Sequence, residues 1–292
     1  MTIQRVAALV STSWLKQRLA QAGAASKGQL RVLDTSWLPE PHVDGYTEFY
    51  KKGHIENSYF FDLKKLSKKR PDSPIDCPIP DSNLFQEYVE SFGINNNTHV
   101  VAYDSLNSRS SMRTWYLFRL FGHDKVSVLN GGMTQWLKDG NHVTQVEPRP
   151  AEKSVFSVNL RSELLKDFKS MMKLVQSQDV QIIDARPAAP GFYTTDDDPS
   201  GGHIPGSKNI PFPTLFNEDM TVKSEVELQQ LFDAAGVDLT KPVVATCQRG
   251  MTACAVALAA HILGKVDVPV YNGSWCEWSA VAPAEYLVKT KQ

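Results

Sequence analysis

The sequence predicts an α/β protein of two tandem domains, each built on a mostly parallel sheet flanked by helices. Two observations predict this fold class: the chain repeats itself at a nearly constant spacing, and within each copy short apolar runs alternate with helical patterns. The length of 292 residues fits two domains, because one domain usually takes ~100–200 residues. We therefore expect a domain over residues 1–140, a proline-containing linker over 141–160 and a second domain over 161–292.

The repeat consists of four pairs of segments that recur in the same order. The pairs are VLDTSW (32–37) with IIDARP (182–187), GHIENSYFF (53–61) with GHIPGSKNIPF (202–212), the stretch 100–122 with 243–264, and VSVLNGGMTQW (126–136) with VPVYNGSWCEW (268–278). Their offsets are 150, 149, 143 and 142 residues. Such constant spacing indicates that one domain-sized unit was duplicated.

The predicted strands are short runs rich in β-branched residues that show no polar alternation. They cover residues 31–36, 99–104, 127–130, 181–186, 243–247 and 268–272. Continuous apolar runs of this length are typical of strands that are buried on both faces. Each copy therefore supplies three strands to the interior of a sheet.

The predicted helices have apolar residues at three- and four-residue spacing. They cover residues 83–92, 111–121 and 225–235, and a further alanine-rich helix begins near Thr252. Strands that alternate with helices imply a parallel sheet with helices on both sides. Ligands of such sheets bind beyond the carboxyl ends of the strands.

Cys247 is the candidate catalytic residue, because it stands at the end of the strand 243–247 and precedes the alanine-rich helix. The intervening loop consists of Gln248, Arg249, Gly250, Met251 and Thr252. This loop can curl so that its N–H groups point inward, and Gly250 permits a positive φ. Unpaired amides and the helix macrodipole both favour the thiolate over the thiol. The alternative for a free cysteine is a small buried hydrophobe, and Cys254, in the helix, and Cys276, in the GSWCEW turn, fit that alternative better.

Two arginines belong to the same edge of the sheet. Arg186 ends the strand 181–186 and Arg249 lies in the loop, so both can bind an anion. The alternatives are a salt bridge between Arg186 and Asp184, and a solvated charge at Arg249. With the backbone of the 248–252 loop, the two arginines predict a small anionic substrate.

Charge and cysteine usage exclude several other classes of function. The chain has 31 Lys and Arg against 32 Asp and Glu, so no charge excess favours nucleic acid or a membrane as partner. The four cysteines form no C-x-x-C pair, which argues against a zinc site or a dithiol. The sequence contains no run of ~20 apolar residues, so we expect no membrane-spanning helix. We expect a cytoplasmic protein, with a mitochondrial form as the alternative.

The basic run 64–70 is interpreted as a solvated face, or as a docking surface for an acidic partner.

With the Cys247 loop, the DAR strand end, the GHIPGS turn and the duplication, the chain resembles the two-domain rhodaneses. This family contains the thiosulfate sulfurtransferases and their 3-mercaptopyruvate sulfurtransferase relatives, and the similarity runs from STSWL (11–15) beyond the GSWCEW turn (273–278). The resemblance implies two tandem rhodanese-like domains with the active one C-terminal. Asp104 holds the place of Cys247 in the first copy, so the N-terminal domain is expected to be catalytically silent.

The resemblance also implies a double displacement. The Cys247 thiolate takes the outer sulfur of the donor to form a persulfide, and cyanide or a thiol, such as glutathione or thioredoxin, then removes that sulfur. No metal or organic cofactor is required. Donor choice depends on the loop: thiosulfate-using relatives carry a pattern like C-R-K-G-V-T, and mercaptopyruvate enzymes carry C-G-S-G-V-T. This chain reads CQRGMT, so the cation Arg249 favours the dianion thiosulfate, with 3-mercaptopyruvate as the alternative.

Two departures from the family patterns bear on the donor. The mercaptopyruvate group has a serine–histidine–aspartate set, of which Asp62 remains here, while Arg249 replaces the serine and Cys77 stands where histidine is expected. Both groups also tend to show a second arginine after DAR, and this chain has Pro190 there. Anion binding is therefore expected to depend on Arg186 and Arg249.

Overall fold

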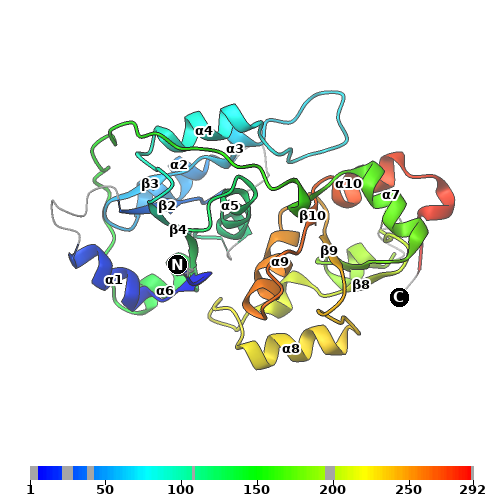
Figure 1. Cartoon of the computed structure of the whole chain (residues 1–292). Helices are drawn as coiled ribbons and strands as arrows, with labels where there is room; N and C mark the ends of the chain where they lie inside the picture. The colour runs from blue at the N-terminus through cyan, green and yellow to red at the C-terminus, as the bar shows by residue number, and fades with distance from the viewer. Residues whose placement is uncertain (1–5, 22–28, 38–42, 107–108, 195–200, 291–292) are drawn as a thin grey trace, which may run out of the picture. The chain divides into compact units, whose positions relative to one another are not determined.

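A computed structural model describes residues 6–21, 29–37, 43–106, 109–194 and 201–290. The chain divides into two compact units, and each has its own parallel sheet (Figure 1). Unit 1 consists of Met1–Leu66, Ile79–Arg161 and Glu218–Val222, and unit 2 consists of Ser67–Pro78, Ser162–Asn217 and Lys223–Gln292. Each half of the sequence therefore contributes a short segment to the unit formed mainly by the other half.

Unit 1 contains, among its described residues, a five-stranded parallel sheet in the order β1-β5-β4-β2-β3. The strands are β1 (Leu9–Val10), β2 (Leu30–Asp34), β3 (Ser58–Phe60), β4 (His99–Tyr103) and β5 (Val126–Leu129). The helices are α1 (Thr12–Gln21), α2 (Gly45–Glu48), α3 (Leu63–Leu66), α4 (Ser82–Glu90), α5 (Arg109–Leu120) and α6 (Gly132–Lys138).

Unit 2 repeats this topology within its described residues, with the strand order β6-β10-β9-β7-β8. The strands are β6 (Leu165–Lys166), β7 (Gln181–Asp184), β8 (Ser207–Asn209), β9 (Val243–Thr246) and β10 (Val270–Tyr271). The α-helices are α7 (Phe168–Ser177), α8 (Glu225–Ala234), α9 (Ala253–Ile262) and α10 (Ser274–Val281), and Ala188–Phe192 forms one π-helical turn. The fold class predicted from the sequence is confirmed.

The central strands owe their place to their apolar side chains. All four residues of β9 are buried, and so are Val100–Tyr103 of β4. The helix α9 packs against β9 and β10, and eight of its ten residues are buried. A helix of this kind is apolar on every side, and its alanines allow close packing. The predicted strand runs and the predicted helices over 83–92, 111–121 and 225–235 are confirmed as β2, β4, β5, β7, β9, β10, α4, α5 and α8.

Two features of the fold differ from the simplest interpretation of the sequence. The GSWCEW segment is not a turn, because the helix α10 begins at Ser274 within it. Residues 141–161 belong to unit 1, where Thr144 exchanges two backbone hydrogen bonds with His54 and the backbone N–H of Phe156 donates to the Glu90 carboxylate at 3.0 Å. The proline-containing segment thus packs against the first sheet's helices and loops before the chain enters unit 2.

Two short segments, Ser67–Pro78 in unit 2 and Glu218–Val222 in unit 1, come from the other half of the sequence, and we call them the exchanged segments. They are held in equivalent ways. In unit 1, Asn130 follows β5 and its side-chain oxygen accepts a hydrogen bond from the Val222 N–H at 2.8 Å. In unit 2, Asn272 follows β10 and its side-chain amide donates to the Cys77 carbonyl at 3.0 Å. The two asparagines lie at equivalent places of the repeat, so the duplication extends to the way that each unit anchors its added segment.

Candidate active site

The carboxyl ends of three neighbouring strands of unit 2 meet at one edge of the sheet. The strand β9 lies between β7 and β10, so the residues that follow these strands are neighbours. They are Arg186 after β7, Cys247 after β9, and Asn272 with Ser274 after β10. This placement agrees with the expectation that the ligand of a parallel sheet binds beyond its carboxyl ends.

Cys247 lies at the base of the loop and is only 1% exposed. Its sulfur accepts a hydrogen bond from the Gly250 N–H at 3.1 Å. Gly250 has a φ of +79°, and a Cβ atom at this position would lie 2.6 Å from the Asn272 carbonyl oxygen. Only glycine fits this curl, which brings the backbone N–H of Gly250 onto the sulfur.

The other backbone amides of the loop remain available to a ligand. In the part of unit 2 that the structure describes, the N–H groups of Gln248, Arg249, Met251 and Thr252 donate no hydrogen bond within the chain. The helix α9 begins at the next residue, Ala253, without a side-chain cap. Unpaired amides at the positive end of a helix dipole form a typical anion-binding arrangement. The Met251 side chain is buried, that of Thr252 is half-buried and that of Gln248 is exposed.

The helix α10 holds the loop from its other side. The N–H groups of Trp275 and Cys276 donate to the carbonyl oxygens of Cys247 and Gln248 at 2.9 and 3.0 Å. The first turn of a helix has no internal acceptors for its amides, so here the loop carbonyls satisfy them. The same contacts hold the start of the loop, Cys247 and Gln248, against α10.

Ser274 is a contact of Cys247 that the sequence did not single out. Its hydroxyl accepts a hydrogen bond from the Cys247 N–H at 3.2 Å and donates to the Tyr271 carbonyl at 2.8 Å, and it lies 3.9 Å from the cysteine sulfur. Ser274 has a φ of +52°, and Gly132, its equivalent in the first copy, has a φ of +54°. A serine in a left-handed conformation that suits glycine indicates that its side chain is needed at this position. The glycine at the equivalent place in the first copy is the signal in the sequence that could have identified it.

Arg186 is 3% exposed, and each of its three guanidinium nitrogens donates a hydrogen bond within unit 2. It forms a salt bridge to Asp184 at 2.5 Å, and it donates to the carbonyl oxygens of Gly191 and Gly202 at 3.0 and 2.6 Å. Its guanidinium carbon also lies 4.7 Å from the centre of the Trp275 ring. The geometry thus matches the alternative of a buried salt bridge rather than an anion clamp aimed at Cys247.

Arg249 keeps its expected place in the loop and is 40% exposed at its side chain. Its Nε atom lies 3.0 Å from the Asp76 carboxylate, which also pairs with Lys69 at 2.9 Å. Sequence reasoning did not find this partner, because Asp76 precedes Arg249 by more than half of the chain and reaches it only in the exchanged segment Ser67–Pro78.

The equivalent loop of unit 1 is built without a thiol. The Asp104 carboxylate accepts hydrogen bonds from the backbone N–H groups of Leu106 at 2.9 Å and Ser111 at 2.8 Å. The Asp104 carboxylate thus accepts hydrogen bonds from the backbone N–H groups of Leu106 and Ser111, so these groups are not available to a bound anion. Ser36 stands where unit 2 has Arg186, and burial raises the pKa of the neighbouring Asp34 to about 6.

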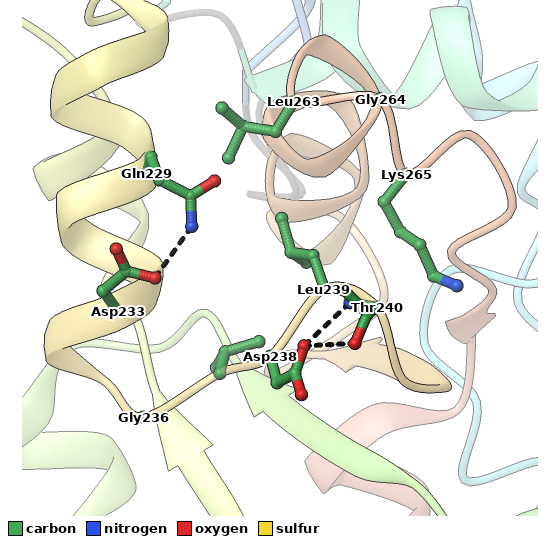
Figure 2. A pocket seen from close by; sticks show the side chains of 10 residues that line it. Gln229, Asp233, Gly236, Asp238, Leu239, Thr240, Leu263, Gly264 and Lys265 are labelled. Atoms are coloured by element: carbon green, nitrogen blue, oxygen red, sulfur yellow. Dashed lines mark hydrogen bonds between the residues drawn. The ribbon is translucent and has the colours of Figure 1, made fainter.

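A pocket of about 580 Å³ lies at the opposite edge of the unit 2 sheet, around the loop that leads into β9 (Figure 2). Its lining includes Asp233, Asp238 and Lys265, and none of the residues that the sequence predicts as the site. Within the described ranges, no group of three or more His, Cys, Asp or Glu side chains could hold a metal ion. No described helix is long and apolar enough to cross a bilayer.

Comparison with known proteins agrees with this geometry. A model of the rhodanese-like domain matches residues 11–139 and 167–281. The chain is 45% identical to a thiosulfate sulfurtransferase of Gallus gallus over 285 residues, which are 96% of each chain, and 39% identical to a 3-mercaptopyruvate sulfurtransferase of Rattus norvegicus over 288 residues, 96% of this chain and 95% of the relative. The crystal structure of SseA from Escherichia coli, a 3-mercaptopyruvate sulfotransferase by its description, superposes with a TM-score of 0.79 at 28% identity over 92% of this chain and 99% of the other. The protein therefore belongs to the rhodanese family, with a rhodanese-like domain in each half of its chain.

Proposed function

We propose that this protein is a sulfurtransferase that moves the outer sulfur of thiosulfate to cyanide or a thiol through a persulfide on Cys247. The observation that carries the proposal is the position of the Cys247 sulfur, 3.1 Å from the Gly250 N–H and at the base of a loop whose other amides are unpaired. The names of the relatives at 45% and 39% identity support sulfur transfer. In this proposal unit 2 is the catalytic unit, and unit 1 is a domain that Asp104 leaves silent.

The first half-reaction forms one sulfur–sulfur bond and breaks another. The Cys247 thiolate attacks the outer sulfur of thiosulfate, and the electron pair of the broken S–S bond leaves with sulfite. The enzyme keeps a cysteine persulfide, whose negative charge the loop amides stabilise by hydrogen bonds that need no rearrangement. Gly250 is the donor that the structure already places on the sulfur.

The second half-reaction returns the enzyme to its starting state. Cyanide attacks the outer sulfur of the persulfide and leaves as thiocyanate, so the Cys247 thiolate is regenerated. A thiol acceptor, such as glutathione or a thioredoxin, would leave carrying the persulfide sulfur instead. Atoms and electrons balance with protein groups alone, so the proposed cycle includes no cofactor. The four free cysteines support the proposed setting of a reducing cytoplasmic or mitochondrial compartment.

Thiosulfate is the preferred donor in this proposal and 3-mercaptopyruvate the second candidate. Arg249 supports thiosulfate, because it adds a positive charge beside the amides that the dianion would contact. The identity to both groups of relatives keeps 3-mercaptopyruvate as the alternative donor.

Trapping of the persulfide tests the proposal. We expect the intact protein, incubated with thiosulfate and freed of excess donor, to gain the mass of one sulfur atom and to lose it when cyanide is added. Peptide mapping should place the added sulfur on Cys247, and the Cys276→Ser variant should gain it equally. A protein that gains no sulfur from thiosulfate or 3-mercaptopyruvate would contradict the proposed catalytic function.

Donor choice is tested by removing the side chains that follow Cys247. The double change Gln248→Gly and Arg249→Gly is expected to lower kcat/KM for thiosulfate by about tenfold or more, and that for 3-mercaptopyruvate much less, because the dianion loses more Coulomb energy than the monoanion. Steady-state kinetics with both donors and cyanide measure the two ratios. Equal losses for the two donors would count against Arg249 as a thiosulfate contact.

A further inference from the structure

The exchanged segment Ser67–Pro78 brings an acidic residue onto the only loop cation of the proposed active site. Asp76 lies 3.0 Å from the Arg249 Nε, and the carboxylate and guanidinium side chains are 24% and 40% exposed. Both groups are therefore partly shielded from water, so their attraction is stronger than that of a fully exposed pair. The site gains its cation from the catalytic loop and an acid from the other half of the sequence.

The segment is fixed against the catalytic loop by one buried residue. Asn272 is 6% exposed, and its side-chain amide donates to the carbonyl of Cys77, the residue after Asp76. The carbonyl oxygen of the same asparagine lies against Gly250, where a Cβ atom would meet it at 2.6 Å. Asn272 thus contacts both the segment that carries Asp76 and the loop that carries Arg249. The backbones of the two ion-pair partners are therefore held at a fixed distance from each other.

The local charges decide what the ion pair does to a donor. Lys69 pairs with Asp76 at 2.9 Å, so one carboxylate is shared by two cations. A donor anion that contacts Arg249 competes with this carboxylate for the guanidinium group and is repelled by it. Coulomb energy is proportional to charge, so the repulsion on a dianion is twice that on a monoanion at the same place.

We propose that Asp76 is a specificity-determining residue that holds Arg249 and lowers the preference of the Cys247 loop for doubly charged sulfur donors. This inference rests on the proposed function, because it assigns the charge class of donor to the same site. Asp76 acts through Arg249 and is a positioning residue. In this arrangement Arg249 attracts both donor classes, and Asp76 reduces the difference in affinity between the dianion and the monoanion.

The test compares two variants of one segment that change the net charge equally. Asp76→Asn removes the partner of Arg249, and Asp72→Asn is the matched control, because Asp72 is exposed and lies in the same segment. At low ionic strength we expect Asp76→Asn to raise kcat/KM for thiosulfate by about tenfold and that for 3-mercaptopyruvate by about threefold, so that the first factor is near the square of the second. We expect Asp72→Asn to change either value by less than about twofold. The gain should shrink as salt is added.

A second comparison shows whether the effect passes through Arg249. In a background of Arg249→Gln, the change Asp76→Asn is expected to alter the ratio of the two kcat/KM values much less than in the parent protein, since the competition for the guanidinium group is gone and only the direct repulsion by the carboxylate is removed. An Asp76→Asn variant that is slower with both donors, or that keeps the parent ratio of donors, would overturn the inference. The persulfide adduct separates the two hypotheses: an adduct that forms in Asp76→Asn with an unchanged donor ratio rejects the role of Asp76 alone, and an adduct that forms in no variant rejects sulfur transfer itself.

Discussion

Replacing Cys247 by serine is expected to lower kcat/KM for thiosulfate by at least about 10⁴-fold, to the level of the reaction without enzyme. A serine hydroxyl at neutral pH is not ionised and does not attack sulfur, so neither half-reaction can begin. The loop amides and Arg249 remain in place in this variant, and donor binding is expected to persist. The production of thiocyanate from thiosulfate and cyanide measures the loss.

The control for this prediction is the fold of the variant. Serine is close to cysteine in size, and the Gly250 N–H can donate to its oxygen as it does to the sulfur, so the midpoint of thermal unfolding should move by only a few degrees. Intact-mass measurement should find no added sulfur on the variant after exposure to thiosulfate. Turnover by Cys247→Ser above the rate without protein, or a sulfur adduct on another cysteine, would move the chemistry away from Cys247.

Arg186→Ala is expected to lower the free energy of unfolding by about 3–5 kcal/mol. The change leaves the Asp184 carboxylate buried without its partner and removes the donors to the carbonyl oxygens of Gly191 and Gly202. Breaking one side of a buried ion pair is costly, because the remaining charge keeps its desolvation penalty. Denaturant unfolding at pH 7, followed by a signal from unit 2, measures the change.

The first copy of the domain indicates how this loss should vary with pH. Asp34, at the place of Asp184, has no arginine beside it, and burial raises its pKa to about 6. A buried acid of this kind is protonated in the folded state below pH 6, so its penalty is absent at about pH 4 and grows as the pH rises towards 6. The destabilisation of Arg186→Ala relative to the parent protein should therefore be smaller at pH 4 than at pH 7.

A double variant controls for packing. Exchanging both partners for apolar side chains of similar size, Asp184→Leu with Arg186→Met, removes the unpaired charge and should cost less than Arg186→Ala alone. An Arg186→Ala variant that unfolds at the parent's denaturant concentration but shows a raised KM for both donors would instead assign Arg186 to anion binding, as the sequence had predicted.

Much of this protein is determined by local pattern in its sequence. The strands β2, β4, β5, β7, β9 and β10 are recognisable because buried parallel strands are continuous apolar runs. The duplication predicts the same topology twice, and both sheets share it. The Cys247 loop is recognisable because it connects an apolar strand to a helix at the carboxyl end of the strand, where parallel sheets bind their ligands. The strands β1, β3, β6 and β8 are not predicted from the sequence. They have only two or three residues and depend on pairing with their neighbours.

Only the tertiary structure decided which charged groups meet. From the sequence, Arg186 could pair with Asp184 or face a substrate anion, and the structure places it in the buried pair. Asp76 reaches Arg249 because the segment Ser67–Pro78 packs in unit 2, and no local pattern marks that exchange. The physical reason is the range of the interactions: apolar periodicity and backbone conformation are set by neighbours in the chain, whereas the partner of a charge is set by desolvation and distance once remote segments have been brought together.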